Sequence, residues 1–126
     1  MQLSPADVAR ALSILGRLKE YRENHPQNYY VKASHILQVV NQLPAPWHLS
    51  DSGLRELINW LADNKHPIGS CARGYWYITH SSEYDSALNF LRGRVAEIAE
   101  RVRKMTEAKV DMTKRESSIF GTGVSA

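Results

Sequence analysis

The stretch from Leu49 to Ile78 constrains the fold most, because it joins a capped amphipathic helix to a short β-prone segment. Ser50 is placed to cap the helix, its side-chain oxygen accepting a backbone N–H of the first turn. Leu49 and Leu54 stand at the spacing of a hydrophobic staple. Apolar residues then recur at helical spacing: Leu54, Leu57, Ile58 and Leu61. The pattern predicts a helix near Asp51–Lys65 with one buried face.

A β-hairpin is expected directly after this helix. Pro67 prevents the helix from continuing, and two β-prone runs follow, Ile68–Cys71 and Tyr75–Ile78. The connection Ala72-Arg73-Gly74 contains glycine and has the length of a hairpin loop.

Side chains of the second run should alternate between two faces of the hairpin. We expect Trp76 and Ile78 to enter the core. Tyr75 and Tyr77 then lie on the outer side, close to Arg73 at the tip.

The chain before Leu49 supplies the elements that normally precede such a unit. Ser4-Pro5-Ala6-Asp7 is typical of a helix start, and the apolar spacing predicts a helix to about Glu23. Tyr29-Tyr30-Val31 has the length of an edge strand. Ser34 is the expected cap of a short helix that stops before Pro44. This order predicts a winged helix-turn-helix: a mostly α domain with a small β-hairpin wing, of the α+β class.

A long amphipathic helix is expected over residues 82–109. Its apolar residues form an unbroken a/d heptad: Tyr84, Leu88, Leu91, Val95, Ile98, Val102 and Met105. We expect the first half of this stripe to pack on its own domain. The second half is expected to form a two-helix dimer seam through Leu91, Val95, Ile98, Val102 and Met105. The predicted organisation is a winged domain over 1–81, a dimerisation helix over 82–109 and a flexible tail over 110–126.

Charge and composition set wider bounds. The sequence pI is about 9.1, yet segments 1–31, 32–78 and 79–126 each carry a net charge of only +1. No basic block exists, so a DNA-binding face would have to be assembled by folding. No apolar run is long enough to span a membrane, and we expect no signal peptide. The single cysteine fits a reducing compartment, which predicts a cytoplasmic protein.

No residue pattern indicates catalysis. The five histidines have no His or Cys partner at metal-ligand spacing, and one cysteine cannot build a zinc site. Cys71 is expected to be a small hairpin residue rather than a nucleophile. The glycines match no phosphate-binding fingerprint. We therefore expect a non-enzyme without metal or cofactor.

Candidate DNA-binding residues follow from the geometry of a recognition helix and a wing. Arg55 suits a guanine edge or a phosphate, Asn59 an adenine edge and Ser52 a phosphate. Arg73 is placed to enter a minor groove or contact a phosphate. The complete predicted set is Lys32, Ser34, Ser52, Arg55, Asn59, Lys65, Arg73 and Tyr75.

The segment from Ser34 to Lys109 resembles small winged-helix proteins of phage and prophage type. The resemblance is carried by four groups of residues: Leu49-Ser50-Asp51 with Leu54, Ile58 and Leu61; Pro67-Ile68-Gly69-Ser70; Arg73-Gly74-Tyr75-Trp76; and the amphipathic Leu88–Met105. It implies a transcriptional regulator or a replication-associated factor. This chain departs from the pattern because its recognition helix begins Asp51-Ser52-Gly53 rather than with basic residues.

Two functions from different classes stay open. The first is a dimeric DNA-binding protein that reads double-stranded DNA with Asp51–Lys65 and Arg73, its C-terminal helices setting the half-site spacing. The second is a phage-borne inhibitor or adaptor in which the same fold grips a host protein. The near-neutral charge of each third favours the second, whereas Arg55, Asn59 and Arg73 at reading positions favour the first.

Overall fold

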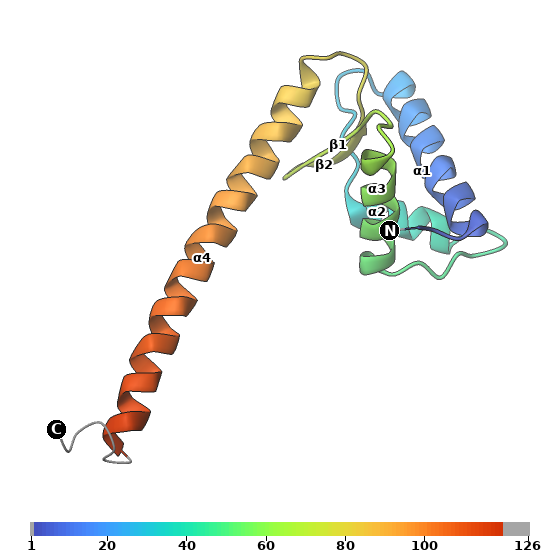
Figure 1. Ribbon diagram of the computed structural model, residues 1–126. Coiled ribbons are helices and arrows are strands. Elements are labelled where there is room, and N and C mark those ends of the chain that lie inside the picture. Colours follow the sequence, from blue (N-terminus) through green and yellow to red (C-terminus); the bar gives the residue numbers. More distant parts are fainter. Residues whose placement is uncertain (1, 120–126) are drawn as a thin grey trace. The chain divides into compact units, whose positions relative to one another are not determined.

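The computed structural model describes residues 2–119 and divides the chain into two units, residues 1–90 and 91–126 (Figure 1). The described part is mostly helical with a small antiparallel sheet, as predicted. Its elements in chain order are α1 (Pro5–Asn24), α2 (Ala33–Asn41), α3 (Asp51–Asp63), β1 (Ile68–Cys71), β2 (Gly74–Tyr77) and α4 (Glu83–Ile119).

The predicted caps of α1 and α3 are confirmed. The Ser4 hydroxyl accepts the Asp7 backbone N–H at 3.1 Å, and the Ser50 hydroxyl accepts that of Gly53 at 3.0 Å. A serine cap satisfies one of the backbone donors that every helix start leaves unpaired. Both helices therefore begin where the local sequence dictates.

The predicted cap of α2 is wrong. Lys32 occupies the N-cap position without a side-chain hydrogen bond, and Ser34 lies inside the first turn. The cause is the preceding residue, Val31, which exchanges two backbone hydrogen bonds of 2.8 Å with Tyr75 of β2. This bridge fixes the chain up to Val31 in extended form, so the helix begins immediately afterwards. The expected strand at residues 29–31 is reduced to this single bridge.

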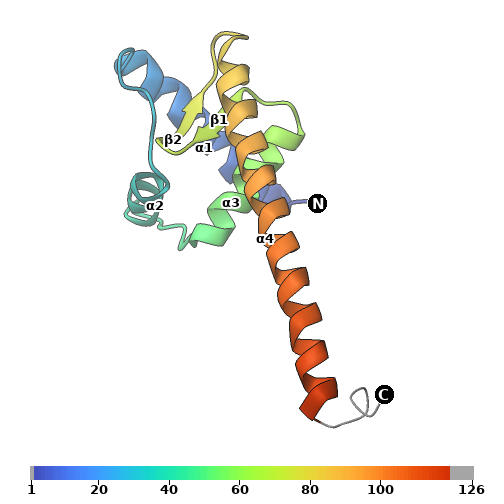
Figure 2. The same cartoon turned by 90° about the vertical axis from the view of Figure 1, so that its left-hand side faces the viewer.

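The main core of unit 1 lies among α1, α2, α3 and the start of β1 (Figures 1 and 2). The predicted inner face of α3 is buried as expected. It packs with one face of α1 and with apolar residues before and within α2. The buried members are Ala11, Ile14, Leu18, Val31, Ile36, Leu54, Leu57, Ile58, Leu61 and Ile68.

The connection between α2 and α3 is held by one side chain, Asn41. Its Nδ2 donates to the Leu49 carbonyl at 2.9 Å, and its Oδ1 accepts the Leu49 N–H at 2.7 Å. Trp47 is half-buried against the main core. The loop before α3 is therefore fixed by a paired amide clamp and an aromatic contact, rather than left free.

The hairpin forms with a tighter turn than predicted. β2 begins at Gly74, so only Ala72 and Arg73 lie between the strands. Gly74 has φ 127°, and a Cβ there would stand 2.4 Å from the Val31 carbonyl oxygen. Only glycine fits both the backbone conformation and this close approach. The bridge between Val31 and the hairpin therefore depends on Gly74.

Both faces of β2 are covered, which the sequence did not suggest. Trp76 and Ile78 are buried as predicted, but in a separate small cluster with Ala87 of α4. Tyr75 and Tyr77 were expected on an outer side, and this is wrong. They are half-buried against the main core. The hairpin is thus a layer between the core helices and the first turns of α4.

Helix α4 extends ten residues beyond the predicted end at Lys109, to Ile119. The flexible tail expected from residue 110 is therefore wrong for 110–119, and its remainder lies outside the described residues. The boundary between the two units falls after Phe90, inside α4.

The first half of the heptad stripe also differs from expectation. Tyr84 and Leu88 are 41% and 42% exposed, whereas Ala87 is buried against Trp76 and Ile78. One residue along an α-helix is a rotation of about 100°. The face of α4 that packs in unit 1 is therefore a different face from the apolar stripe.

Candidate nucleic-acid interface

The outward face of α3 carries three of the predicted DNA-binding residues. Ser52, Arg55 and Asn59 are exposed and share one side of the helix at spacings of about one and two turns. The opposite side of α3 is buried in the main core, which fixes the rotation of the helix. Ser52 also lies 3.2 Å from the capping Ser50, oxygen to oxygen. The three side chains are therefore presented together on a rigid element.

The charge of α3 opposes a phosphate backbone. Asp51, Glu56 and Asp63 are exposed, and Arg55 is the helix's one cationic side chain. Asp51 has a structural role because an acid in the first turn interacts favourably with the helix dipole. Glu56 has no such role and lies next to Arg55. The outward surface of α3 is therefore net acidic.

Lys65, two residues after the end of α3, has a backbone conformation that favours glycine. Its φ is 63°, its N–H donates to Ala62 O at 3.0 Å, and the next N–H, from His66, donates to Leu61 O at 2.9 Å. This pair of bonds is a Schellman motif, in which the left-handed residue is usually glycine. Lys65 is exposed, so its amine is accessible, but its backbone is strained.

Arg73 at the hairpin tip is exposed and lies over an aromatic ring. Its guanidinium carbon is 5.4 Å from the ring centroid of Tyr30, a cation–π geometry. Burial raises the pKa of Tyr30, so its ring stays neutral beneath the cation. A Cβ on neighbouring Gly74 would stand 3.0 Å from the Lys32 backbone nitrogen, so the tip and the start of α2 adjoin.

The predicted site residues thus fall into two groups. Ser52, Arg55 and Asn59 lie together on α3, and Arg73 lies near the chain segment of Lys32 at the start of α2. Three predicted residues belong to neither group. Ser34 is exposed within α2, Lys65 follows α3, and Tyr75 is half-buried.

The strongest polar cluster in unit 1 was missed by the sequence analysis. Arg22 of α1 and Glu83 of α4 form a two-pronged ion pair, with nitrogen–oxygen distances of 2.5 and 3.0 Å. Arg22 also donates to the Tyr77 carbonyl at 2.8 Å, and the Trp76 indole N–H donates to Glu83 at 2.9 Å. This cluster, here the Arg22–Glu83 anchor, joins α1, β2 and α4.

The electrostatics of the anchor follow from its partial burial. Burial is the largest single influence on Glu83 and raises its pKa. The hydrogen bonds from Arg22 and Trp76, with the Arg22 charge, outweigh burial and hold the pKa below its ordinary value of 4.5. The hydrogen bond to Glu83 raises the pKa of Arg22. Both groups are therefore charged at neutral pH. A buried Trp whose N–H requires an acceptor was the one available signal.

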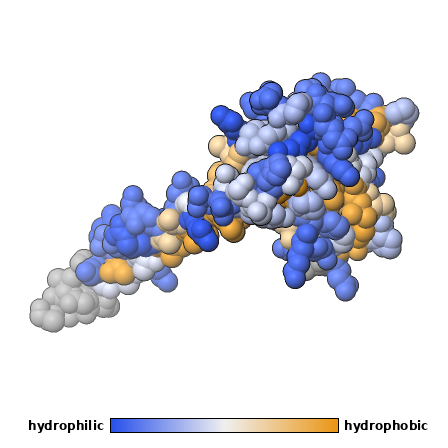
Figure 3. All heavy atoms as spheres, turned by 90° about the horizontal axis from the view of Figure 1, so that it is seen from above, coloured by the Kyte–Doolittle hydropathy of each residue, from blue (hydrophilic) through white to orange (hydrophobic). Residues whose placement is uncertain are grey.

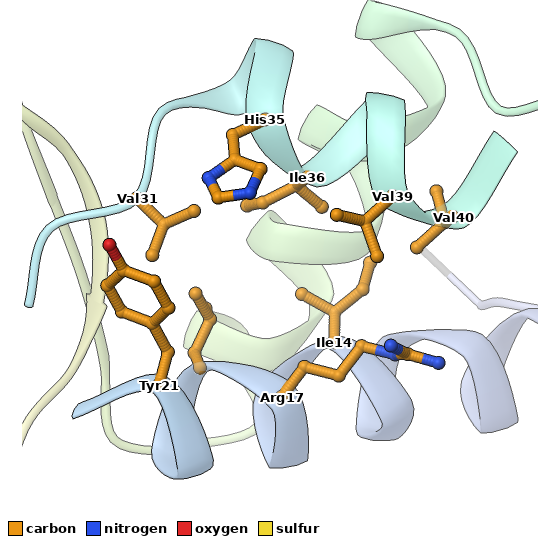
Figure 4. A pocket seen from close by; sticks show the side chains of 9 residues that line it. Ile14, Arg17, Tyr21, Val31, His35, Ile36, Val39 and Val40 are labelled. Carbon is orange, nitrogen blue, oxygen red and sulfur yellow. The ribbon is translucent and has the colours of Figure 1, made fainter. Parts of the chain in front are cut away.

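An apolar cavity of about 150 Å³ lies between α1 and α2 (Figure 4). Figure 4 shows side chains of both helices facing this space, with the His35 ring on the α2 side and the Arg17 side chain running along α1. The apolar lining residues are Ile14, Leu18, Val31, Ile36, Val39 and Val40. Because α2 is held by α3 on its other side, the cavity marks a place where unit 1 is incompletely packed.

In unit 2, the predicted dimerisation residues are all exposed. Leu91, Val95, Ile98, Val102 and Met105 are 51–67% exposed, and Figure 3 shows apolar side chains among hydrophilic ones along α4. Elsewhere on this helix, Arg103 pairs with Glu100 and Glu107 at 2.5 and 2.6 Å. We call the five exposed apolar residues the α4 seam.

Within residues 2–119 the structure shows neither a metal-binding group nor a membrane-spanning helix. No group of three or more His, Cys, Asp or Glu side chains there is arranged to hold a metal ion. None of the helices described is both long and apolar enough to span a membrane. Comparison of the chain with protein-family models, curated proteins and solved structures gives no match. The resemblance to phage-type winged-helix proteins therefore stays a prediction.

Proposed function

We propose that unit 1 is a winged helix-turn-helix domain that binds double-stranded DNA, and that the chain acts as a homodimer through α4. One observation carries the proposal. The inner face of α3 is fully engaged in the core while Ser52, Arg55 and Asn59 project from its outer face. A helix held in this way is what major-groove reading requires.

The order of the elements supports a winged helix. Three helices precede the hairpin, and Val31, between the first two, pairs with β2 in the manner of the short edge strand of such domains. The tip residue Arg73 lies where a wing contacts DNA. The resemblance drawn from the sequence points the same way, to a phage-type transcriptional regulator or replication accessory without catalytic activity.

Each exposed side chain has a role that its chemistry suits. Arg55 can donate two hydrogen bonds to a guanine edge, and Asn59 can pair with an adenine edge. Ser52 and Lys32 would contact phosphates and set the position of the helix. Arg73 would contact a phosphate or the minor groove beside the hairpin tip.

The decisive experiment is fluorescence anisotropy of the full-length protein with a non-specific duplex, as salt is raised from about 50 to about 200 mM. Contact with four phosphates would weaken binding about 150-fold over this range. Arg55→Ala and Arg73→Ala should each weaken binding further. Arg17→Ala is the matched control, because it removes one exposed cation from α1, outside the predicted site. No measurable binding at the lower salt concentration would refute contact with the DNA backbone.

A second function is favoured by a specific observation, the acidic outer surface of α3. Asp51, Glu56 and Asp63 against Arg55 would suit a basic patch on a host protein better than DNA. Glu56→Gln separates the two proposals because the variant removes one carboxylate with little change of shape. DNA binding should become about two- to fivefold tighter in this variant, because the side chain at position 56 no longer carries a negative charge that repels the DNA phosphates. If DNA binding is unchanged or weaker, the protein-interaction module is the better description.

A further inference from the structure

The α4 seam is flanked by residues of one charge sign. In heptad terms, Val95 and Val102 are a positions, and Leu91, Ile98 and Met105 are d positions. The adjoining g positions hold Arg94 and Arg101, and the adjoining e positions hold Arg92, Ala99 and Thr106. Between Leu91 and Met105 no carboxylate borders the seam.

The carboxylates of this part of the helix lie elsewhere. Glu100 and Glu107 occupy f positions, on the side opposite the seam, and both are paired with Arg103. Glu97 occupies a c position, also away from the seam. The charged side chains at the e and g positions beside the seam are therefore Arg92, Arg94 and Arg101.

We infer that the seam pairs with the seam of a second copy of this chain, with the two helices parallel and in register. This inference rests on the homodimer proposed above and specifies its geometry. In a parallel pair, each g residue faces the e residue of the next heptad on the other helix. Arg94 then faces Ala99 of the second copy, and Arg101 faces Thr106. No arginine faces another.

The antiparallel arrangement brings like charges together. There, g positions face g positions. With the two seams centred on each other, Arg94 of each copy faces Arg101 of the other, so two Arg–Arg contacts form. Moving the register by one heptad brings Arg101 against its own counterpart. The flanking charges therefore select the parallel orientation without any attractive ion pair across the seam.

The apolar residues agree with two parallel strands. β-branched residues at a with leucine at d favour parallel dimers; both a residues, Val95 and Val102, follow this rule, as does Leu91 among the three d residues. Lys109 occupies the next a position and is exposed. A lysine at a single a position restricts register and oligomer state. A parallel seam also places both copies of unit 1 at the same end of the helix pair, as reading two adjacent half-sites requires.

Disulfide cross-linking in full-length protein tests the orientation. Cys71→Ser removes the natural thiol, and single cysteines are then introduced as Leu91→Cys, Val102→Cys or Met105→Cys. A disulfide needs Cα atoms within about 7 Å of each other. In a parallel pair, Leu91→Cys and Met105→Cys should each cross-link to themselves on mild oxidation. In an antiparallel pair the a residues of one helix face the d residues of the other, so residue 91 lies against residue 102 and residue 105 against residue 88. Neither cysteine then reaches its own counterpart, because residues 91 and 102 are about 16 Å apart along a helix and residues 88 and 105 about 25 Å.

Mixing two different single-cysteine variants gives a test in which the cross-link reports the antiparallel pair instead of the parallel one. Leu91→Cys protein carrying an affinity tag is mixed with untagged Val102→Cys protein, and the covalent dimers are separated by mass. The parallel pair yields only tagged–tagged and untagged–untagged dimers, because residues 91 and 102 are about 16 Å apart along the axis. A dominant tagged–untagged dimer would overturn the parallel orientation and leave the homodimer standing.

Sedimentation equilibrium of the same proteins under reducing conditions distinguishes a wrong orientation of the helix pair from the absence of a homodimer. A dimer with self-cross-linking at both positions supports the inference. A monomer that forms no cross-links overturns both the seam and the proposed homodimer. Arg94→Glu adds an independent readout. In the parallel pair this side chain faces alanine, so the dimer dissociation constant should change less than about threefold. An antiparallel pair would gain two attractive contacts and tighten about tenfold or more.

Discussion

Replacing Glu83 should destabilise unit 1 markedly, because its carboxylate fixes the start of α4 to α1 and β2. The Glu83→Gln side chain keeps the shape but loses the charge that pairs with Arg22, and it offers the Trp76 indole N–H only an uncharged acceptor. The side chains of Arg22 and Glu83 are only 15% and 14% exposed, so water replaces the lost interactions poorly. Breaking a buried ion pair costs about 3–5 kcal/mol, and losing a charged hydrogen bond about 1.5–3 kcal/mol. We expect a loss of about 2–4 kcal/mol in the free energy of unfolding, because the cluster is not completely buried.

Urea unfolding followed by tryptophan fluorescence measures this loss, since Trp76 is buried beside Glu83. Asp85→Asn is the matched control. It removes an equal charge from the first turn of α4, and so the same helix-dipole contribution, at an exposed side chain. The control should cost less than about 1 kcal/mol. Equal losses for the two variants would refute the assignment of Glu83 as the residue that fixes α4 to unit 1.

The pH dependence provides a second check on Glu83. Its pKa in the folded protein lies below the ordinary value of 4.5, so its stabilising contribution is complete above about pH 4.5. The contribution is lost as the pH falls through the folded pKa, where the carboxylate becomes protonated. The stability difference between wild type and Glu83→Gln should therefore shrink below pH 4.5. A difference that stays constant down to about pH 2 would show that the lost charge is not its cause.

Three further substitutions test other features of unit 1. Gly16→Ala should raise the free energy of urea unfolding by about 1 kcal/mol, because Gly16 lies inside α1 and a Cβ there would meet nothing within 4 Å beyond the adjoining backbone of its own helix. A loss of stability would mean that α1 is packed on this side. Val40→Ile should add about 0.8 kcal/mol or less, because the new methyl group enters the cavity of about 150 Å³. A decrease in melting temperature would indicate that this space is already filled. Lys65→Gly should raise the melting temperature, because glycine fits φ 63° without strain, yet weaken DNA binding if the amine contacts phosphate. Unchanged binding would remove Lys65 from the interface.

Features set by neighbouring residues could be predicted from the sequence. The caps at Ser4 and Ser50, the buried stripe of α3 and the hairpin all follow from contacts within a few positions. The prediction that Ser34 caps α2 was wrong, and the reason shows the limit of such local rules. Its start is set by the bridge from Val31 to Tyr75, a partner far along the chain.

The Arg22–Glu83 anchor could not be predicted, because its two members are 61 positions apart. Its consequence for α4 was missed as well. The heptad pattern shows which face of the helix is apolar but not which face meets unit 1. The ion pair and the small Ala87 turn a different face inward, and Tyr84 and Leu88 are left exposed.

The end of α4 was misjudged because the composition was given more weight than the helix propensity. Residues 110–117 contain threonine, lysine and serine, which are typical of tails, but no glycine or proline. Lys114, Arg115 and Glu116 are good helix formers, and a helix already established adds such residues at little cost. The first glycine after Gly93 in the sequence is Gly121. The absence of glycine and proline, rather than polarity, was therefore the better guide for residues 110–119.

The acidic outer surface of α3 makes the DNA proposal depend on the α4 seam. A single unit 1 should have little affinity for a duplex, because the outer face of α3 offers Arg55 and Asn59 to DNA but also carries three carboxylates that repel phosphates. Joining two such units raises affinity about 10²- to 10⁴-fold through effective concentration alone. Ile98→Asp, which places a charge in the seam, should therefore weaken DNA binding by about a hundredfold or more.

Ala96→Asp is the control for this last prediction, because Ala96 is exposed outside the seam and the variant adds the same charge. DNA binding should change by less than about threefold in the control. Sedimentation equilibrium should show that Ile98→Asp is monomeric and Ala96→Asp is not. If monomeric Ile98→Asp still binds DNA as wild type does, one unit 1 is sufficient. The contact surface would then have to be a more basic one than the outer face of α3.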